Sequence, residues 1–140
     1  MNKLVPALAV LLLFALTACA AQTAGGAGVE VSGVTVLSSG EWPENAYTKE
    51  LPVPSGKVSW TTVDKEHNSC GISVSGIDED GYQDYCGKLA QAGFSVVHTV
   101  SEKVAGQDYV STGTLYSNGE KSLSISYIPG SLTIYISTEA

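Results

Sequence analysis

The stretch "KSLSISYIPGSLTIYIS", residues 121–137, alternates apolar and polar side chains on both sides of a central Pro-Gly pair. Pro129-Gly130 favours a type II turn, and the runs on either side of it have the two-residue period of β-strands. One face would carry the apolar side chains and the other face Ser, Thr and Tyr135. We therefore predict a hairpin with one face in the core and one in water; its apolar residues are Leu123, Ile125, Tyr127, Leu132, Ile134 and Ile136.

Similar patterns on the N-terminal side extend this hairpin into a sheet. Residues 94–101 and 108–117 alternate, and Asn118-Gly119 favours a type I′ turn into the strand that begins near residue 121. A second hairpin is predicted over residues 57–63 and 70–76, where Val58, Trp60 and Thr62 alternate with polar residues before the turn "DKEHNS". Short turns make these neighbouring strands antiparallel.

A single helix is predicted in "IDEDGYQDYCGKLAQAG", residues 77–93. Asp78 can cap its first turn, and Gly93 can end it. Gly81 and Gly87 each weaken a helix by about 1 kcal/mol relative to Ala, so this helix depends on packing. The elements predict an α+β fold of order ββαββββ, with one helix packed on an antiparallel sheet of about six strands as a two-layer sandwich.

The segment "EWPENAYTKELPVPSG", residues 41–56, precedes the first hairpin and contains three of the five prolines. Proline removes a backbone donor and favours extended neighbours, so the segment is neither a helix nor a central strand. We call it the strap. It has two interpretations: a loop that presents Trp42 and Tyr47 to a partner, or a cover over one end of the core.

The first residues have the features of an export signal. Lys3 precedes an apolar run too short for a permanent membrane span, and the run ends in Leu16-Thr17-Ala18-Cys19. This sequence resembles the lipobox of bacterial lipoprotein precursors, in which the cysteine receives a lipid and becomes the mature N-terminus. The resemblance implies a signal peptide over residues 1–18 and a diacylglyceryl group on Cys19; the alternative is an ordinary cysteine behind a secretory signal.

After residue 18 the expected organisation is a tether over residues 19–40 and a single domain over residues 41–140. The Gly-rich "AAQTAGGAG", residues 20–28, is typical of a flexible linker, while "VEVSGVTVL", residues 29–37, is either a short edge strand or part of that linker. Residues 19–140 contain six Lys, no Arg and 14 acids, a formal charge of −8. This charge argues against nucleic acid and anionic lipid headgroups as partners.

The two remaining cysteines, Cys70 and Cys86, are expected in the interface between strand and helix. An even number of cysteines in an exported domain favours a disulfide between them; the alternative is two buried free thiols.

No metal, cofactor or catalytic pattern emerges from the sequence. Asp78, Asp80 and Asp84 fail as a calcium loop because Tyr82 and Leu89 stand where ligands are needed, and His67 and His98 lack zinc spacing. No nucleophile elbow or phosphate loop is present. We therefore expect a protein that is not an enzyme and needs no cofactor.

The pattern of the strap and domain adds a second resemblance. "WPENAYTKELPVPSGKV" followed by two strands and a helix that ends in "LAQAGF" is similar to a family of small bacterial lipoproteins of unknown function. The similarity covers about residues 41–137. It implies the same domain and a place in the cell envelope, and it implies no activity.

These observations lead to one expected function with two alternatives. We expect a membrane-anchored lipoprotein on the extracytoplasmic side of a bacterial cell or outer membrane that binds another envelope protein through Trp42 and Tyr47. The first alternative is a glycan or cell-wall binding module in which Tyr135 stacks on sugar rings. A hydrolase is the weaker second alternative.

Overall fold

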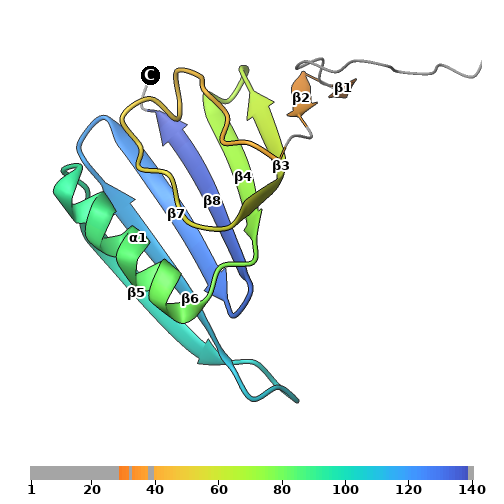
Figure 1. Cartoon of the computed structure of the whole chain (residues 1–140). Coiled ribbons are helices and arrows are strands. Elements are labelled where there is room, and N and C mark those ends of the chain that lie inside the picture. Colours follow the sequence, from red (N-terminus) through yellow and green to blue (C-terminus); the bar gives the residue numbers. More distant parts are fainter. Residues whose placement is uncertain (1–28, 32, 38–39, 139–140) are drawn as a thin grey trace, which may run out of the picture.

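The computed structural model describes residues 29–31, 33–37 and 40–138, which form one antiparallel sheet with a helix and the strap on the same face (Figure 1). The strand order is β1-β2-β3-β4-β8-β7-β6-β5, and every neighbouring pair is antiparallel. The elements are β1 (Val29–Val31), β2 (Val34–Leu37), β3 (Lys57–Asp64), β4 (Ser69–Ser75), α1 (Glu79–Gln91), β5 (Ser95–Lys103), β6 (Val110–Ser117), β7 (Lys121–Ile128) and β8 (Ser131–Thr138).

The predicted α+β fold with one helix on an antiparallel sheet is confirmed, and so is the hairpin on which the prediction rests. Strands β7 and β8 pair from Lys121 with Thr138 to Ile128 with Ser131, and Gly130 has the positive φ of 90° that a type II turn needs. Helix α1 begins where its cap was predicted, because the Asp78 carboxylate accepts a hydrogen bond from the Gly81 amide at 2.8 Å.

The structure differs from the predicted sheet in three details. Strands β1 and β2 join the sheet beside β3, so the segment 29–37 forms the edge of the sheet and is not part of the linker. The sheet therefore has eight strands instead of about six. A register shift between Val58 and Trp60 turns the Trp60 side chain out of the core, to 40% exposure. Asn118 has no positive φ, so a loop of residues 118–120 replaces the type I′ turn, with the Asn118 side chain accepting from two backbone amides.

The pairing of β4 with β8 joins the two parts of the sheet. The first hairpin and the last four strands would otherwise be separate, and seven residue pairs from Ser69–Ser137 to Ser75–Ser131 link them. Ile72 lies opposite Ile134, and both side chains are completely buried. The core is therefore continuous from β3 to β6.

One face of this sheet carries nearly the whole core, and two different segments cover it. Helix α1 covers the β7 side, where the Tyr82 ring stacks on the Tyr127 ring with centroids 4.2 Å apart and planes 3° from parallel. Burial raises the pKa of Tyr82 to about 12 and keeps its phenol neutral. The strap covers the β4 side, where Asn45 approaches the Cys70 sulfur. Each segment thus covers its own part of the apolar face.

The two glycines of α1 provide a matched test of this packing. A Cβ at Gly81 would overlap the Ser55 hydroxyl and crowd Asp78 Oδ1 and Ile77 Cγ1 at 3.1 and 3.2 Å, so Gly81→Ala is expected to lower the free energy of unfolding. A Cβ at Gly87 would meet no atom within 4 Å, so Gly87→Ala should raise the free energy of unfolding by about 0.5–1 kcal/mol through helix propensity alone. Urea unfolding of the two variants measures both signs, and equal effects would contradict the close contact between α1 and the end of the strap.

Candidate functional site in the strap

The strap is ordered by a reciprocal pair of hydrogen bonds within one tight turn. Asn45 Oδ1 accepts from the Tyr47 and Thr48 amides at 2.9 and 3.1 Å, and Thr48 Oγ1 accepts from the Asn45 amide at 3.0 Å. The Thr48 hydroxyl donates to the Pro43 carbonyl at 2.7 Å. This exchange between two side chains and three backbone amides resembles a helix capping box. It fixes the backbone of a segment that has no strand or helix partner.

Two buried side chains and one lysine of the sheet hold this turn against the sheet. Thr48 and Leu51 are buried, at 4% and 7% exposure. The Lys121 ammonium at the start of β7 donates to the Lys49 carbonyl at 2.7 Å and lies 4.0 Å from the Glu50 carboxylate. The chain leaves the turn through Glu50, a non-glycine residue with a positive φ of 75°. The strap is thus a docked part of the domain.

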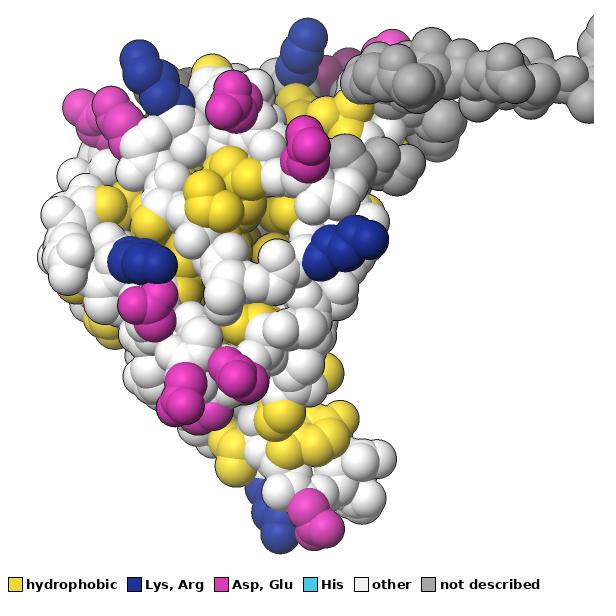
Figure 2. All heavy atoms as spheres, viewed as in Figure 1, with side chains coloured by type: hydrophobic (Ala, Val, Ile, Leu, Met, Phe, Trp, Pro, Cys, Tyr) yellow, Lys and Arg dark blue, Asp and Glu magenta, His cyan; other side chains and the backbone are white. Residues whose placement is uncertain are grey.

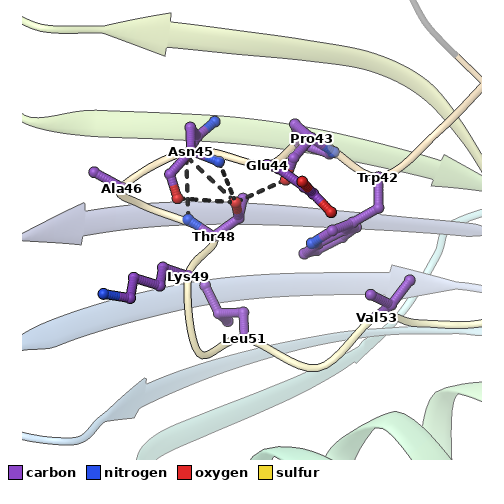
Figure 3. A pocket seen from close by; sticks show the side chains of 9 residues that line it. All are labelled: Trp42, Pro43, Glu44, Asn45, Ala46, Thr48, Lys49, Leu51 and Val53. Atoms are coloured by element: carbon purple, nitrogen blue, oxygen red, sulfur yellow. Dashed lines mark hydrogen bonds between the residues drawn. The ribbon is translucent and has the colours of Figure 1, made fainter.

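The bend of the strap forms a groove of about 500 Å³ (Figure 3). Its apolar side chains include Trp42, which is half-buried against the core, and Val53, which is 53% exposed. Figure 2 shows that the face covered by the strap and α1 has hydrophobic side chains open to solvent between separate acidic and basic groups. The residues that line the groove are Trp42, Pro43, Glu44, Asn45, Ala46, Thr48, Lys49, Leu51 and Val53.

The three residues predicted to form a binding surface lie on two different faces of the sheet. Trp42 and Tyr47 both belong to the strap and pack partly against the core. Tyr135 lies on the opposite face of the sheet and is 49% exposed. On that face the Trp60 ring lies over Gly71, which is the direct cross-strand neighbour of Tyr135. A partner on the strap and a ligand on Tyr135 would therefore use different surfaces.

The two cysteines predicted to form a disulfide are free thiols in the structure, and it does not bring them together. Cys70 is buried on β4 beneath the strap, where the side-chain amide nitrogen of Asn45 lies 4.0 Å from the Cys70 sulfur. Cys86 on α1 faces Tyr82 and Tyr116, and Tyr116 lies on β6. The sequence periodicity correctly predicted that both cysteines lie on the core side of their elements. It could not predict that α1 and the strap cover different strands, which keeps the two cysteines apart.

The polar clusters considered in the sequence have structural roles. Asp78 caps α1, and Asp84 forms an exposed ion pair with Lys88 at 2.7 Å. His67 lies in the turn between β3 and β4, where its Nδ1 is 2.7 Å from Asp64 Oδ2; this hydrogen bond raises the pKa of His67 and lowers that of Asp64. Within residues 29–31, 33–37 and 40–138, no group of three or more His, Cys, Asp and Glu is arranged to hold a metal ion.

Sequence reasoning missed the residues that hold the groove in shape. Thr48, Lys121 and Val53 were not singled out, although the spacing of Asn45 and Thr48 resembles the capping box and was a usable signal. The contact between Lys121 and the strap spans 72 residues along the chain, so no local pattern could have predicted it.

Comparison with known proteins places the chain in no established group: no protein-family model matches it, and no curated protein matches it either. The described part of the chain contains no helix that is long and apolar enough to cross a membrane. Residues 1–28, which include Cys19, lie outside the described residues.

The hydroxyl of Thr48 offers a direct test of how the strap is held. Thr48→Val keeps the shape of the side chain but leaves the backbone amide of Asn45 and the Pro43 carbonyl without the hydroxyl partner. The free energy of unfolding should therefore fall by about 1–3 kcal/mol. Cleavage after Lys49 by a lysine-specific protease should accelerate, because the turn opens. Thr133→Val, on the half-exposed face of β8, is the control. Unchanged stability and cleavage in Thr48→Val would show that the hydroxyl does not hold the turn.

Proposed function

We propose that the chain is a lipid-anchored, extracytoplasmic bacterial protein whose domain binds a segment of another envelope protein in the groove of the strap. The observation that carries this proposal is that an exposed apolar side chain, Val53, and a half-buried aromatic, Trp42, line one concave surface. Apolar and aromatic anchors that enter a pocket dominate most protein interfaces. The proposal assigns the domain no catalytic activity.

The fixed shape of the groove supports a binding role. Because Asn45, Thr48 and Lys121 hold the bend of the strap, a partner would not have to order it on binding. Glu44 and Lys49 place one charge of each sign among the lining residues, which favours a partner segment with an apolar anchor and a mixed polar rim. The groove therefore fits a short peptide segment better than a charged small molecule.

The location rests on the first 19 residues. An apolar run preceded by Lys3 and ended by Leu-Thr-Ala-Cys supports export and lipidation. Acyl chains contribute about 0.8 kcal/mol per buried methylene, and two or more chains hold a protein firmly to a bilayer. The domain needs no basic surface to stay at the membrane.

Replacing the predicted lipid acceptor tests the location. When Cys19→Ser is expressed in a bacterial host, the product should lose incorporation of labelled fatty acid, because serine lacks the thiol that takes the lipid. It should also move from the membrane fraction to the soluble fraction or stay as uncleaved precursor. Cys86→Ser, which keeps Cys19, should retain the label. A Cys19→Ser product that is labelled and membrane-bound to the same extent would reject the anchor.

Site-specific photocrosslinking tests the groove. A photoreactive phenylalanine analogue at Val53 should yield a discrete protein adduct in cells, since this side chain lies where the partner segment would dock. Adding Trp42→Ala should reduce the adduct several-fold through loss of the aromatic anchor. Absence of any adduct at Val53 would contradict the protein-binding proposal.

The same analogue at Tyr135 is the matched control, because this residue is similarly exposed but lies on the other face. We expect no protein adduct there. The glycan alternative is favoured by the presence of Trp60 and Tyr135 on the same open face, both near Gly71. It predicts the reverse pattern. In that case the protein would co-sediment with peptidoglycan, and Tyr135→Ala would abolish co-sedimentation without any effect of Trp42→Ala.

A further inference from the structure

The outermost strand on one side of the sheet, β5, is long, exposed and unpaired along its outer edge. Nine residues form it, and all nine are exposed. It pairs only with β6 in the part of the chain that the structure describes, so a row of backbone amides and carbonyls faces solvent. In Figure 1 the far end of the β5–β6 hairpin projects beyond α1, and Figure 2 shows hydrophobic side chains gathered at that end.

Strand β5 has little of the protection that usually keeps sheet edges apart. Proteins block such edges with short strands, prolines, bulges or charged side chains. The opposite edge, β1, has three residues, whereas β5 has nine and contains no proline. Its carboxylate and ammonium groups are confined to Glu102 and Lys103 at one end, and its bulge lies near the other end, between Val96 and His98. The regular part between these ends is open to pairing.

The sequence of that regular part is suited to pairing with itself. Residues 98–102 read His-Thr-Val-Ser-Glu, and in an antiparallel pair centred on Val100, His98 of one copy faces Glu102 of the other, twice. Thr99 then faces Ser101, so hydroxyl meets hydroxyl. His98, Val100 and Glu102 share the open face, opposite Leu115, Gly113 and Ser111 of β6. A histidine N–H that donates to a carboxylate directly across a strand pair stabilises the pair.

Other registers lack this complementarity. Directly opposed residues in an antiparallel pair point to the same face of the sheet. A twofold axis that relates two copies of β5 must therefore pass between the two copies of one residue. With the axis at Thr99, Glu102 would face Val96; with the axis at Ser101, Glu102 would face Val100. Only the axis at Val100 gives the histidine–carboxylate pairs and brings two valines, each 46% exposed, into contact.

We propose that two copies of the chain associate edge to edge through β5, antiparallel about a twofold axis at Val100. Backbone hydrogen bonds between the two β5 strands would join the two sheets into one. The contact is a single short strand pair, at the low end of interface sizes, so the dimer would be transient and would form where copies are concentrated. This association leaves the groove of the strap free and does not depend on the proposed partner.

Disulfide trapping of the full chain in mild detergent tests this pairing. Directly opposed residues of an antiparallel pair have Cα atoms about 4.5–5.5 Å apart, within the range of a disulfide, so Val100→Cys should give covalent dimers under mild oxidation. Val110→Cys is the matched control: Val110 is 48% exposed but lies on β6, so its two copies would be about 14 Å or more apart. The unsubstituted chain, which contains Cys19, Cys70 and Cys86, gives the background rate of covalent dimer formation.

We expect trapping at Val100→Cys to be at least about tenfold faster than at Val110→Cys, because only the first pair is within disulfide range. Adding His98→Glu places two carboxylates opposite each other twice, so trapping should slow about two- to thirtyfold, the range of one cross-strand pair counted twice. Adding Glu102→His as well restores a histidine opposite a carboxylate in both pairs and should restore the rate. Equal rates at Val100→Cys and Val110→Cys would overturn the pairing, and a His98→Glu effect that Glu102→His does not reverse would overturn the register.

Discussion

The antiparallel pairing of β4 with β8 is the contact on which the rest of this structure depends. It places the completely buried Ile72 beside Ile134 and joins the first hairpin to the last four strands. Without it, β4 and β8 would each lose a neighbouring strand, and the buried side chains of the two halves would not form one continuous core. The strap also needs it, because the strap contacts Cys70 on β4 and Lys121 on β7, and β8 holds these two strands in one sheet.

The two coverings of the core differ in how they are built, and this difference gives the domain its candidate site. Helix α1 satisfies its backbone internally and covers the core with large side chains such as Tyr82 and Leu89. The strap has no such regular pattern, so side chains must satisfy its backbone, and the Asn45–Thr48 exchange does so. Its irregular course leaves a concave surface beside Trp42, whereas a regular helix would present a convex one.

Local patterns were sufficient for most of the fold. Alternation around Pro129-Gly130, the Asp78 cap and Gly93 predicted the last hairpin and the helix, because these features act between residues close in sequence. The bulge that exposes Trp60 and the separate positions of Cys70 and Cys86 were not predictable, since both depend on contacts between distant strands. For the candidate site, proline and aromatic content singled out the strap, but not Lys121, whose contact spans 72 residues. Tyr135 was placed correctly on the open face, although no pattern indicated that Trp60 would join it there.

The central position of β8 has a consequence for the order in which the domain is completed. Strand β8 follows all other strands along the chain, yet it lies between β4 and β7 in the sheet, and Ile72 pairs with a residue 62 positions later. During synthesis, the β3–β4 hairpin must therefore keep an unpaired apolar edge at β4 until almost the whole domain has been made. Such non-local closure is slow, so the domain completes its core only late in folding.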